Sequence, residues 1–336
     1  MASTIPSGST VLVTGITGYI GSHVADQLLQ AGFKVRGTVR NVEKAAGLLN
    51  QWESKFGAGQ VELVVVQNIS EPGAFDEAVK GVSGIAHVAS NVSFNPDPNI
   101  VITEVISSAH SILDSAMQSP SVKSFVYTAS TSALAPAVFN VAQKLDETSY
   151  NEEAVEKAWA PPPYTMDRAM SVYGASKTQA EQAVFKYATE KKASFVVSSI
   201  VLGVNFGKVL DPSIPSSSGD FVKQIFNGNT EWAKTLDYQW FVDVQDSARL
   251  HVAALTNPEV KNERIIAYSE HFTWNDVMKH LRELRPNHQW VHDFTDPSKK
   301  DISEISNGRG LALLQALGRP GWTSLADSLK LNLEAV

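Results

Sequence analysis

Over its first two hundred residues the chain alternates short apolar runs with helical segments, and this alternation constrains the fold more than any other feature. The apolar runs are nearly continuous in Val, Ile and Ala, as at 61–66 (VELVVV) and 84–89 (GIAHVA). Strands of this kind are buried on both faces, which is typical of parallel sheets covered by helices on each side. We therefore predict an α/β fold with a doubly wound parallel sheet of the Rossmann type.

The predicted elements follow one another at regular intervals. We expect strands over 10–14, 34–39, 61–66, 84–89, 125–129 and 195–201, and helices over 19–30, 42–55, 71–79, 99–117 and 172–191. The helix at 71–79 is expected because Pro72 falls in its first turn, where proline is tolerated.

After residue 203 the pattern loosens. A Pro/Ser-rich loop occupies 211–220, and a helix predicted over 244–255 indicates a return to the main sheet. We predict that residues 1–202 and about 241–265 form a dinucleotide-binding core. Residues of about 203–240 and 266–336 would then form a smaller, C-terminal substrate-binding lobe.

Composition narrows the classes of function. The chain has 28 basic and 35 acidic residues, a net charge of −7, so nucleic acid is not an expected partner. It has no cysteine, which excludes disulfides and thiolate chemistry. No apolar run approaches the roughly 20 residues that cross a bilayer, and residues 1–9 do not resemble a signal peptide. We expect a cytoplasmic monomer or homodimer, away from membranes, that acts on a small molecule.

A glycine-rich loop joins the first strand to the first helix. It reads Gly15-Ile-Thr-Gly18-Tyr-Ile-Gly21, with the spacing GxxGxxG rather than GxGxxG. Such a loop turns the backbone sharply, lets it approach a pyrophosphate closely, and directs a helix N-terminus at the negative charge. Thr17, Tyr19 and Ile20 lie within the same predicted cofactor-binding loop.

The end of the second strand distinguishes the two nicotinamide cofactors. An acidic residue there would bind the ribose hydroxyls of NAD, whereas a basic residue suits the 2′-phosphate of NADP. The strand ends in Gly37-Thr38-Val39-Arg40, and Lys44 follows in the next helix. Because Arg offers a planar fork for phosphate and Lys adds a mobile charge, we expect NADPH as the cofactor.

Tyr173 and Lys177 stand four residues apart on one predicted helix, in the sequence YGASK. A phenol has a pKa near 10, and an adjacent ammonium lowers it toward the range useful for proton transfer. The ammonium could also hold the ribose of the cofactor. A third group should hydrogen-bond the substrate oxygen, and Ser130 at the end of the fifth strand is the favoured residue. Thr131 and Ser132 remain alternatives.

These motifs together resemble the extended short-chain dehydrogenase/reductase family. The resemblance extends from VLVTGITGYIGSHVADQLL through HVAS at 87–90, FVYTAST and YGASK to the segment Leu317-Gly-Arg-Pro-Gly-Trp322. The chain is most similar to the dihydroflavonol reductase-like subgroup. Within that subgroup it resembles fungal NADPH-dependent aldehyde and ketone reductases, especially those of the red-yeast carbonyl reductase type.

The resemblance has implications for individual residues. It implies a catalytic Ser130–Tyr173–Lys177 triad. It also implies cofactor contacts after the third and fourth strands, at Asn68, Ile69, Ala89 and Ser90. One departure follows the sixth strand, where relatives usually carry a proline and this chain has Leu202. The nicotinamide contact is therefore expected through the backbone of Gly203 or Val204.

The expected reaction is reduction of an aldehyde or ketone by hydride from NADPH, with Tyr173 as the proton donor. Apolar residues near the predicted site favour hydrophobic carbonyl substrates, and the candidate pocket walls are Val92, Phe94, Ala133, Tyr238 and Trp240. Two alternatives remain. An epimerase or dehydratase that retains NAD would use the same triad on a nucleotide sugar, and a non-catalytic sensor would bind NADP without turnover.

Overall fold

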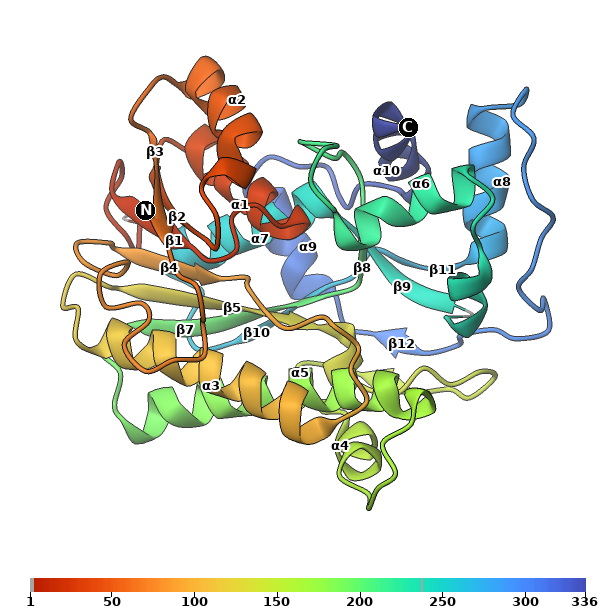
Figure 1. The fold of residues 1–336 in the computed structure, drawn as a ribbon, viewed down its shortest axis with the longest axis horizontal. Helices are drawn as coiled ribbons and strands as arrows, with labels where there is room; N and C mark the ends of the chain where they lie inside the picture. Colours follow the sequence, from red (N-terminus) through yellow and green to blue (C-terminus); the bar gives the residue numbers. More distant parts are fainter. Residues whose placement is uncertain (1–2, 237) are drawn as a thin grey trace.

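The structure, a computed structural model, describes residues 3–236 and 238–336, with only the backbone at 234, 235, 238 and 239. Its centre is a parallel sheet of seven strands in the order β10-β7-β5-β4-β1-β2-β3 (Figure 1). The strands are β1 Thr10–Val13, β2 Lys34–Val39, β3 Val61–Val65, β4 Gly84–His87, β5 Ser124–Ser130, β7 Val196–Leu202 and β10 Arg264–Ala267. The predicted doubly wound parallel sheet is confirmed.

Helices cover both faces of this sheet, as Figure 1 shows. One face carries α1 Tyr19–Gln30, α2 Ala46–Phe56, α7 Val244–Thr256 and α9 Gly308–Ala316, and the other carries α3 Pro98–Met117 and α5 Ala169–Glu190. Each face has its own apolar core, because successive strand residues project to opposite sides. On β5, Phe125 and Tyr127 join the α3/α5 core, whereas Val126 joins the other.

Helix α3 is long and apolar enough to cross a membrane by length and composition alone. In the structure, 56% of its apolar window is buried, and it packs against α5. This is the arrangement of a core helix in a doubly wound sheet.

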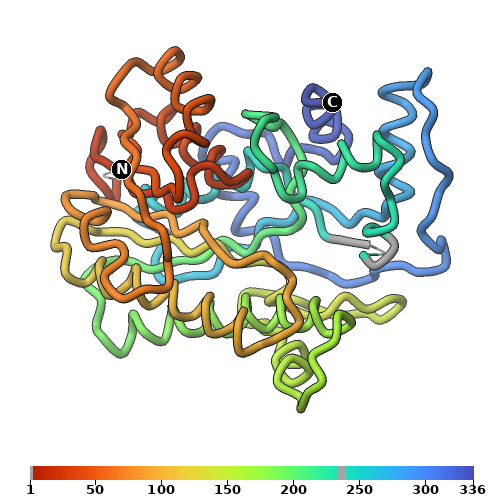
Figure 2. The backbone as a smooth tube through the Cα atoms, viewed as in Figure 1, coloured from red at the N-terminus to blue at the C-terminus, as the bar shows by residue number. Residues whose placement is uncertain are grey.

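The smaller lobe is built around a three-stranded sheet in the order β11-β9-β8. Its strands are β8 Val204–Phe206, β9 Tyr238–Asp243 and β11 Glu270–Thr273, and its helices are α6 Asp220–Phe226, α8 Trp274–Leu284 and α10 Leu325–Asn332. Aromatic side chains fill its core, with Phe206 stacked on Phe241 at 5.9 Å between ring centroids. The C-terminus lies in this lobe, and the first described residues lie beside the central sheet (Figure 2). The boundaries between core and lobe stay a prediction.

The segment between β5 and α5 carries a small strand and a short helix. Its strand β6 Lys144–Leu145 pairs with β12 Glu304–Ile305, and its helix α4 Glu152–Ala158 packs on α5. Asn151 caps α4 by accepting a hydrogen bond from the backbone N–H of Ala154 at 3.0 Å.

The predicted helix at 71–79 is wrong. Residues 72–81 form successive turns, with hydrogen bonds such as Asp76 N to Gly73 O at 3.1 Å. Gly73 has a φ of +76°, in the left-handed region, which interrupts a right-handed helix in its first turn. The other predicted elements of the first two hundred residues are found within a few residues of their expected bounds, although 43–45 is a 3₁₀ turn ahead of α2.

Candidate active site

The glycine loop runs from the end of β1 into α1, with little room for a Cβ at Gly15 and none at Gly21. Gly15 has a φ of +65°, and a Cβ built there would lie 3.2 Å from the Cβ of Ala89. A Cβ at Gly21 would lie 2.3 Å from the carbonyl oxygen of Gly15. Gly18 is the N-cap of α1 and offers no side-chain cap, so the first N–H groups of the helix have no such partner. This cradle fits a pyrophosphate that lies against the backbone.

Tyr19 and Thr17 of this loop face the segment after β8. The Tyr19 hydroxyl donates a hydrogen bond to the Gly207 carbonyl at 2.9 Å, and the Tyr19 ring is buried. A small cavity separates Thr17 and Tyr19 from residues 209–211 and 214–216. Since its side chain holds this segment, Tyr19 could meet a phosphate only through its backbone. Ile20 is half-buried in the next position of α1.

The ends of β1 and β4 are tied together by a hydroxyl. Thr14 Oγ1 accepts hydrogen bonds from the backbone N–H groups of Val88 at 2.9 Å and Ala89 at 3.0 Å. Its own proton therefore goes to Nδ1 of His87, 3.1 Å away, which keeps that imidazole neutral. Burial lowers the pKa of His87 to about 3. Next to them the buried Ser90 Oγ has no hydrogen-bond partner.

Arg40 and Lys44 lie beside this cradle, because β2 pairs in parallel with β1. Arg40 follows the last residue of β2, and both side chains are exposed. Within the described part of the chain neither belongs to an ion pair. Two unpaired cations at the end of the second strand are suited to a phosphate group.

Asn68 and Ile69 follow β3 on the same edge of the sheet. The Asn68 amide is already engaged in its own turn, because Oδ1 accepts from the Ser70 N–H at 3.1 Å and Nδ2 donates to Glu71 Oε1 at 3.0 Å. Ile69 packs against the α3/α5 core. An adenine contact from Asn68 would require this turn to rearrange.

Ser130 and Tyr173 meet at the carboxyl end of β5. Ser130 closes the strand, and its Oγ accepts a hydrogen bond from the Ser132 N–H at 3.2 Å. Its side chain lies close enough to the phenol of Tyr173, on α5, to affect the pKa of that phenol. Thr131 is buried, and Ser132 follows it in the same short turn. The choice of Ser130 over Thr131 and Ser132 as the catalytic hydroxyl stays a prediction.

Lys177 lies one helical turn beyond Tyr173. Its side chain is 4% exposed, and Nζ donates to the Thr128 carbonyl at 3.4 Å. Burial lowers the pKa of Lys177 to about 8, and the negative charge of Glu181 opposes this change. The pKa of Tyr173 is raised by burial, and the neighbouring Ser130 side chain acts in the opposite direction. The pKa of Tyr173 is therefore above its ordinary value in this structure, not below it as the neighbouring ammonium led us to expect.

The backbone predicted to contact nicotinamide is already paired. The Gly203 N–H donates to the Ala267 carbonyl at 3.1 Å, and the Gly203 carbonyl accepts from Asn205 Nδ2 at 2.9 Å. Val204 begins β8 and pairs with Phe241. Leu202 is buried at the end of β7. A cofactor contact at Gly203 would therefore have to share a group that the sheet already uses.

The candidate pocket walls differ widely in exposure. Phe94 is 42% exposed, has a φ of +53°, and its ring lies 5.0 Å from that of Tyr173 between centroids, with the two planes tilted by 39°. Val92 is also exposed, whereas Ala133 is fully buried and has no surface to offer a substrate. Trp240 is buried and donates its indole N–H to Asp301. The side chain of Tyr238 lies outside the described residues.

Several buried polar residues next to the candidate triad were not predicted from the sequence. Thr14 and His87 link β1 to β4, and Asn151 donates from Nδ2 to the Ser132 carbonyl at 2.8 Å. Glu181 and Arg264 form a buried ion pair on the α5 side of the sheet. The sequence carries a signal for Glu181 only, four residues beyond Lys177 on the same helix.

A model of the NAD dependent epimerase/dehydratase family matches residues 11–267. Aldehyde reductase 2 of Sporidiobolus salmonicolor is 38% identical over 329 residues, which cover 97% of this chain and 95% of that protein. The NAD-dependent epimerase/dehydratase terH of Aspergillus terreus is 36% identical over 337 residues, which cover 99% of this chain and 98% of that protein.

Among solved structures, yeast methylglyoxal/isovaleraldehyde reductase Gre2 in complex with NADPH is similar, with a TM-score of 0.81. The two sequences are 23% identical, and the match covers 97% of each chain, so this likeness concerns the fold. The match to the family model spans the central sheet and the candidate triad, and the relatives match nearly end to end. The chain therefore belongs to the NAD dependent epimerase/dehydratase family.

Proposed function

We propose that this protein is an NADPH-dependent reductase of aldehydes and ketones, and that Ser130, Tyr173 and Lys177 are its catalytic residues. The observation that carries the proposal is the packing of α5 against the turn after Ser130 at the carboxyl edge of the sheet: a Cβ at Gly174, next to Tyr173, would lie 3.3 Å from the Ser132 carbonyl oxygen, and Lys177 lies one turn further along the helix. Ligands bind at this edge in open α/β sheets. The names of the aldehyde reductase and ketoreductase relatives support the same activity.

The chain offers three kinds of group to the cofactor. The cradle at Gly15 and Gly21 suits a pyrophosphate, the unpartnered Ser90 Oγ suits a polar group of the ligand, and Arg40 suits a 2′-phosphate. Lys177 would hold the ribose hydroxyls. NADPH supplies hydride when bound, and the protein supplies orientation and proton transfer.

Each residue of the triad would have a separate role at the substrate oxygen. The Tyr173 hydroxyl would release its proton to that oxygen, and the Ser130 hydroxyl would donate a hydrogen bond to it. The positive charge of Lys177 would stabilise the phenolate that Tyr173 leaves behind. Phe94, whose ring contacts that of Tyr173, gives the site an apolar character that favours hydrophobic carbonyl compounds.

The test is NADPH oxidation across aryl ketones, keto esters and aldehydes, with NADH as the comparison. We expect consumption of NADPH with at least one class, and a loss of about 10²-fold or more in kcat for Tyr173→Phe, the scale of general acid catalysis. Met170→Leu, on the same helix but exposed, is the matched control and should retain activity. Unchanged reduction by Tyr173→Phe would disprove the assignment.

A second candidate follows from the family itself. The relative terH is named an NAD-dependent epimerase/dehydratase, and enzymes of that kind would use the same triad on a nucleotide sugar. The exposed Arg40 at the end of β2 counts against NAD. Purified protein that retains NAD, converts a nucleotide sugar and leaves NADPH unconsumed with every carbonyl would favour this candidate.

A further inference from the structure

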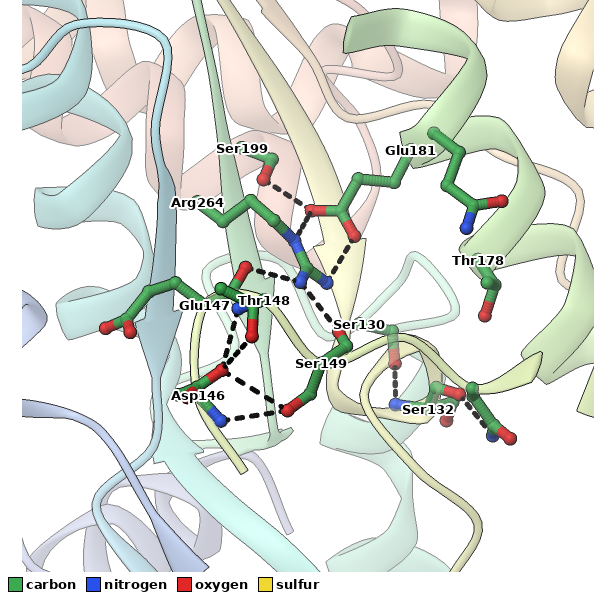
Figure 3. A network of polar contacts seen from close by, with 12 residues as sticks. Ser130, Ser132, Asp146, Glu147, Thr148, Ser149, Thr178, Glu181, Ser199 and Arg264 are labelled. Carbon is green, nitrogen blue, oxygen red and sulfur yellow. Dashed lines mark hydrogen bonds and ion pairs between the residues drawn. The ribbon is translucent and has the colours of Figure 1, made fainter. Parts of the chain in front are cut away.

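A buried ion pair lies one helical turn below the proposed triad. Glu181 of α5 is fully buried, and Arg264 at the start of β10 is 6% exposed. The guanidinium donates from Nε to Glu181 Oε1 at 3.1 Å and from one terminal nitrogen to Oε2 at 2.8 Å, a bidentate arrangement. The Ser199 hydroxyl of β7 donates to the same carboxylate (Figure 3). The pair therefore joins α5 to two strands.

The second terminal nitrogen of Arg264 reaches the segment between β6 and α4. It donates to the carbonyl oxygens of Glu147 at 2.8 Å and Ser149 at 2.7 Å (Figure 3). The ring of Tyr150 covers the guanidinium, with 3.9 Å from Cζ to the ring centroid. One side chain thus fixes the backbone just ahead of Asn151.

Asn151 carries this connection to the turn that follows Ser130. Its backbone N–H donates to the Ala133 carbonyl at 2.9 Å, and its Nδ2 donates to the Ser132 carbonyl at 2.8 Å. Gly174 of α5 packs on the same turn, because a Cβ there would lie 3.3 Å from the Ser132 carbonyl oxygen. These contacts form a continuous network that links the helix with Tyr173 to the turn after Ser130.

The pair also affects the charge around Lys177. Glu181 is the nearest acid along α5, four residues on, and it raises the pKa of Lys177 against the effect of burial. Arg264 brings a compensating positive charge. Three other titratable groups interact with this cluster: His87 of β4 with Lys177, and Tyr127 of β5 and Tyr150 before α4 with Glu181. On the neighbouring helices, Glu152 of α4 accepts a hydrogen bond from Gln182, and His110 and Asp114 of α3 contact Tyr187, further along α5.

A buried ion pair is weak evidence of stability, since well-packed apolar residues often serve as well or better. We propose that Glu181 and Arg264 are a positioning pair for the proposed triad: they hold the Tyr173 helix against the Ser130 turn and balance the charge beside Lys177. This inference rests on the proposed function, because it assigns the pair a role in that reaction.

The test compares variants by kcat, by KM and by the pH at which kcat falls on the alkaline side. Glu181→Gln leaves the charge of Arg264 unbalanced, which favours neutral Lys177 and the phenolate of Tyr173. We therefore expect the alkaline limb to move down by about one pH unit or more and kcat at neutral pH to fall about tenfold or more, with KM within about threefold.

Two further variants separate charge from geometry. Arg264→Lys keeps the charge but loses the fork, so we expect a lower kcat with the alkaline limb unmoved. The double variant Glu181→Gln with Arg264→Met removes both charges, and its limb should return close to that of the wild type. The matched control is Glu263→Gln. It alters the residue next to Arg264 and breaks a bidentate pair with Arg309, and it should change neither kcat nor the alkaline limb of the pH profile.

The outcomes distinguish the two proposals. Wild-type kcat and limb in folded Glu181→Gln, or a kcat loss without a limb shift, would overturn the positioning role while leaving the function intact. If Glu181→Gln does not fold, Arg264→Lys and the double variant decide by the same criteria. Unchanged activity in Tyr173→Phe would instead remove the proposed function.

Discussion

At the scale of single residues, the candidate site separates into side chains whose polar atoms are already used and side chains whose polar atoms are free. The amide of Asn68 makes three hydrogen bonds within its own turn, and the Gly203 N–H belongs to the sheet. Arg40 and Lys44 are exposed and unpaired in the described part of the chain, and Ser90 Oγ has no partner. Cofactor selectivity should therefore depend on the free groups.

Arg40→Ala is expected to weaken the preference for NADPH. A hydrogen bond to a charged group contributes about 1.5–3 kcal/mol, which corresponds to roughly 10- to 100-fold in kcat/KM with NADPH. The values with NADH should change little, since NADH lacks the 2′-phosphate. The control is Lys191→Ala, which removes the same charge at the far end of α5 and should change neither cofactor. An equal loss with both cofactors would contradict the role of Arg40.

The residues of the candidate site could be predicted where a motif is local. Tyr173 and Lys177 share one helix, and Ser130 ends a strand that its own run of apolar residues indicates. The hydrogen bond of the Gly203 N–H could not be predicted, because its acceptor Ala267 belongs to a strand more than sixty residues away. The Glu181–Arg264 pair depends on the same long-range placement of β10 beside β7.

At the scale of elements, the regular alternation in the first half of the chain predicts nearly every strand and helix of the central sheet. The exception at 71–79 arises because the sequence pattern does not reveal the backbone conformation of a glycine. Gly73 adopts a φ of +76°, and the segment forms turns in place of a helix. The lobe is less predictable, because its strands β8, β9 and β11 are short and pair across distant segments. The connection from β1 to α1 is the element that most directly shapes the candidate cofactor site.

Gly21→Ala is expected to disrupt that connection. The new Cβ would lie 2.3 Å from the Gly15 carbonyl oxygen, and the loop backbone would have to move. Overpacking of this kind costs about 1–3 kcal/mol, and we expect NADPH affinity to fall about tenfold or more. Urea unfolding and NADPH fluorescence titration measure the two effects. Gly308→Ala, at the start of α9 with no atom within 4 Å of the new Cβ, should be neutral in both.

At the scale of the whole molecule, the two faces of the sheet are held partly by neutral histidines. His251 accepts a hydrogen bond from Thr128 Oγ1 at 2.9 Å and donates from Nδ1 to the Ser247 carbonyl at 2.7 Å, which links α7 to β5. Burial lowers the pKa of His251 and of His23 to about 4, and that of His87 to about 3. Folding therefore excludes protons that the unfolded chain would bind below pH 6.5.

The free energy of unfolding should fall as the pH drops from 7 to 5. Each of these histidines binds a proton near pH 5 only when unfolded, so each makes stability rise with pH by about 1.4 kcal/mol per unit. Buried Asp243 acts in the opposite direction, because burial raises its pKa to about 6 and the folded state holds its proton. Three histidines less one aspartate mean that the unfolded chain binds about two more protons than the folded chain near pH 5. The free energy of unfolding therefore rises by about 2.7 kcal/mol per pH unit there.

Urea unfolding at pH 7, 6 and 5 measures this slope, and His251→Gln isolates one contribution to it. The variant lowers stability at every pH by removing buried contacts, but the informative quantity is the slope, which should decrease by about 1.4 kcal/mol per pH unit near pH 5. His292→Gln removes an exposed histidine and should leave the slope unchanged. A less stable His251→Gln with the wild-type slope would mean that the acid sensitivity lies in other groups. A reduced slope would assign that share of the acid sensitivity to His251, which lies between α7 and the strand that ends at Ser130.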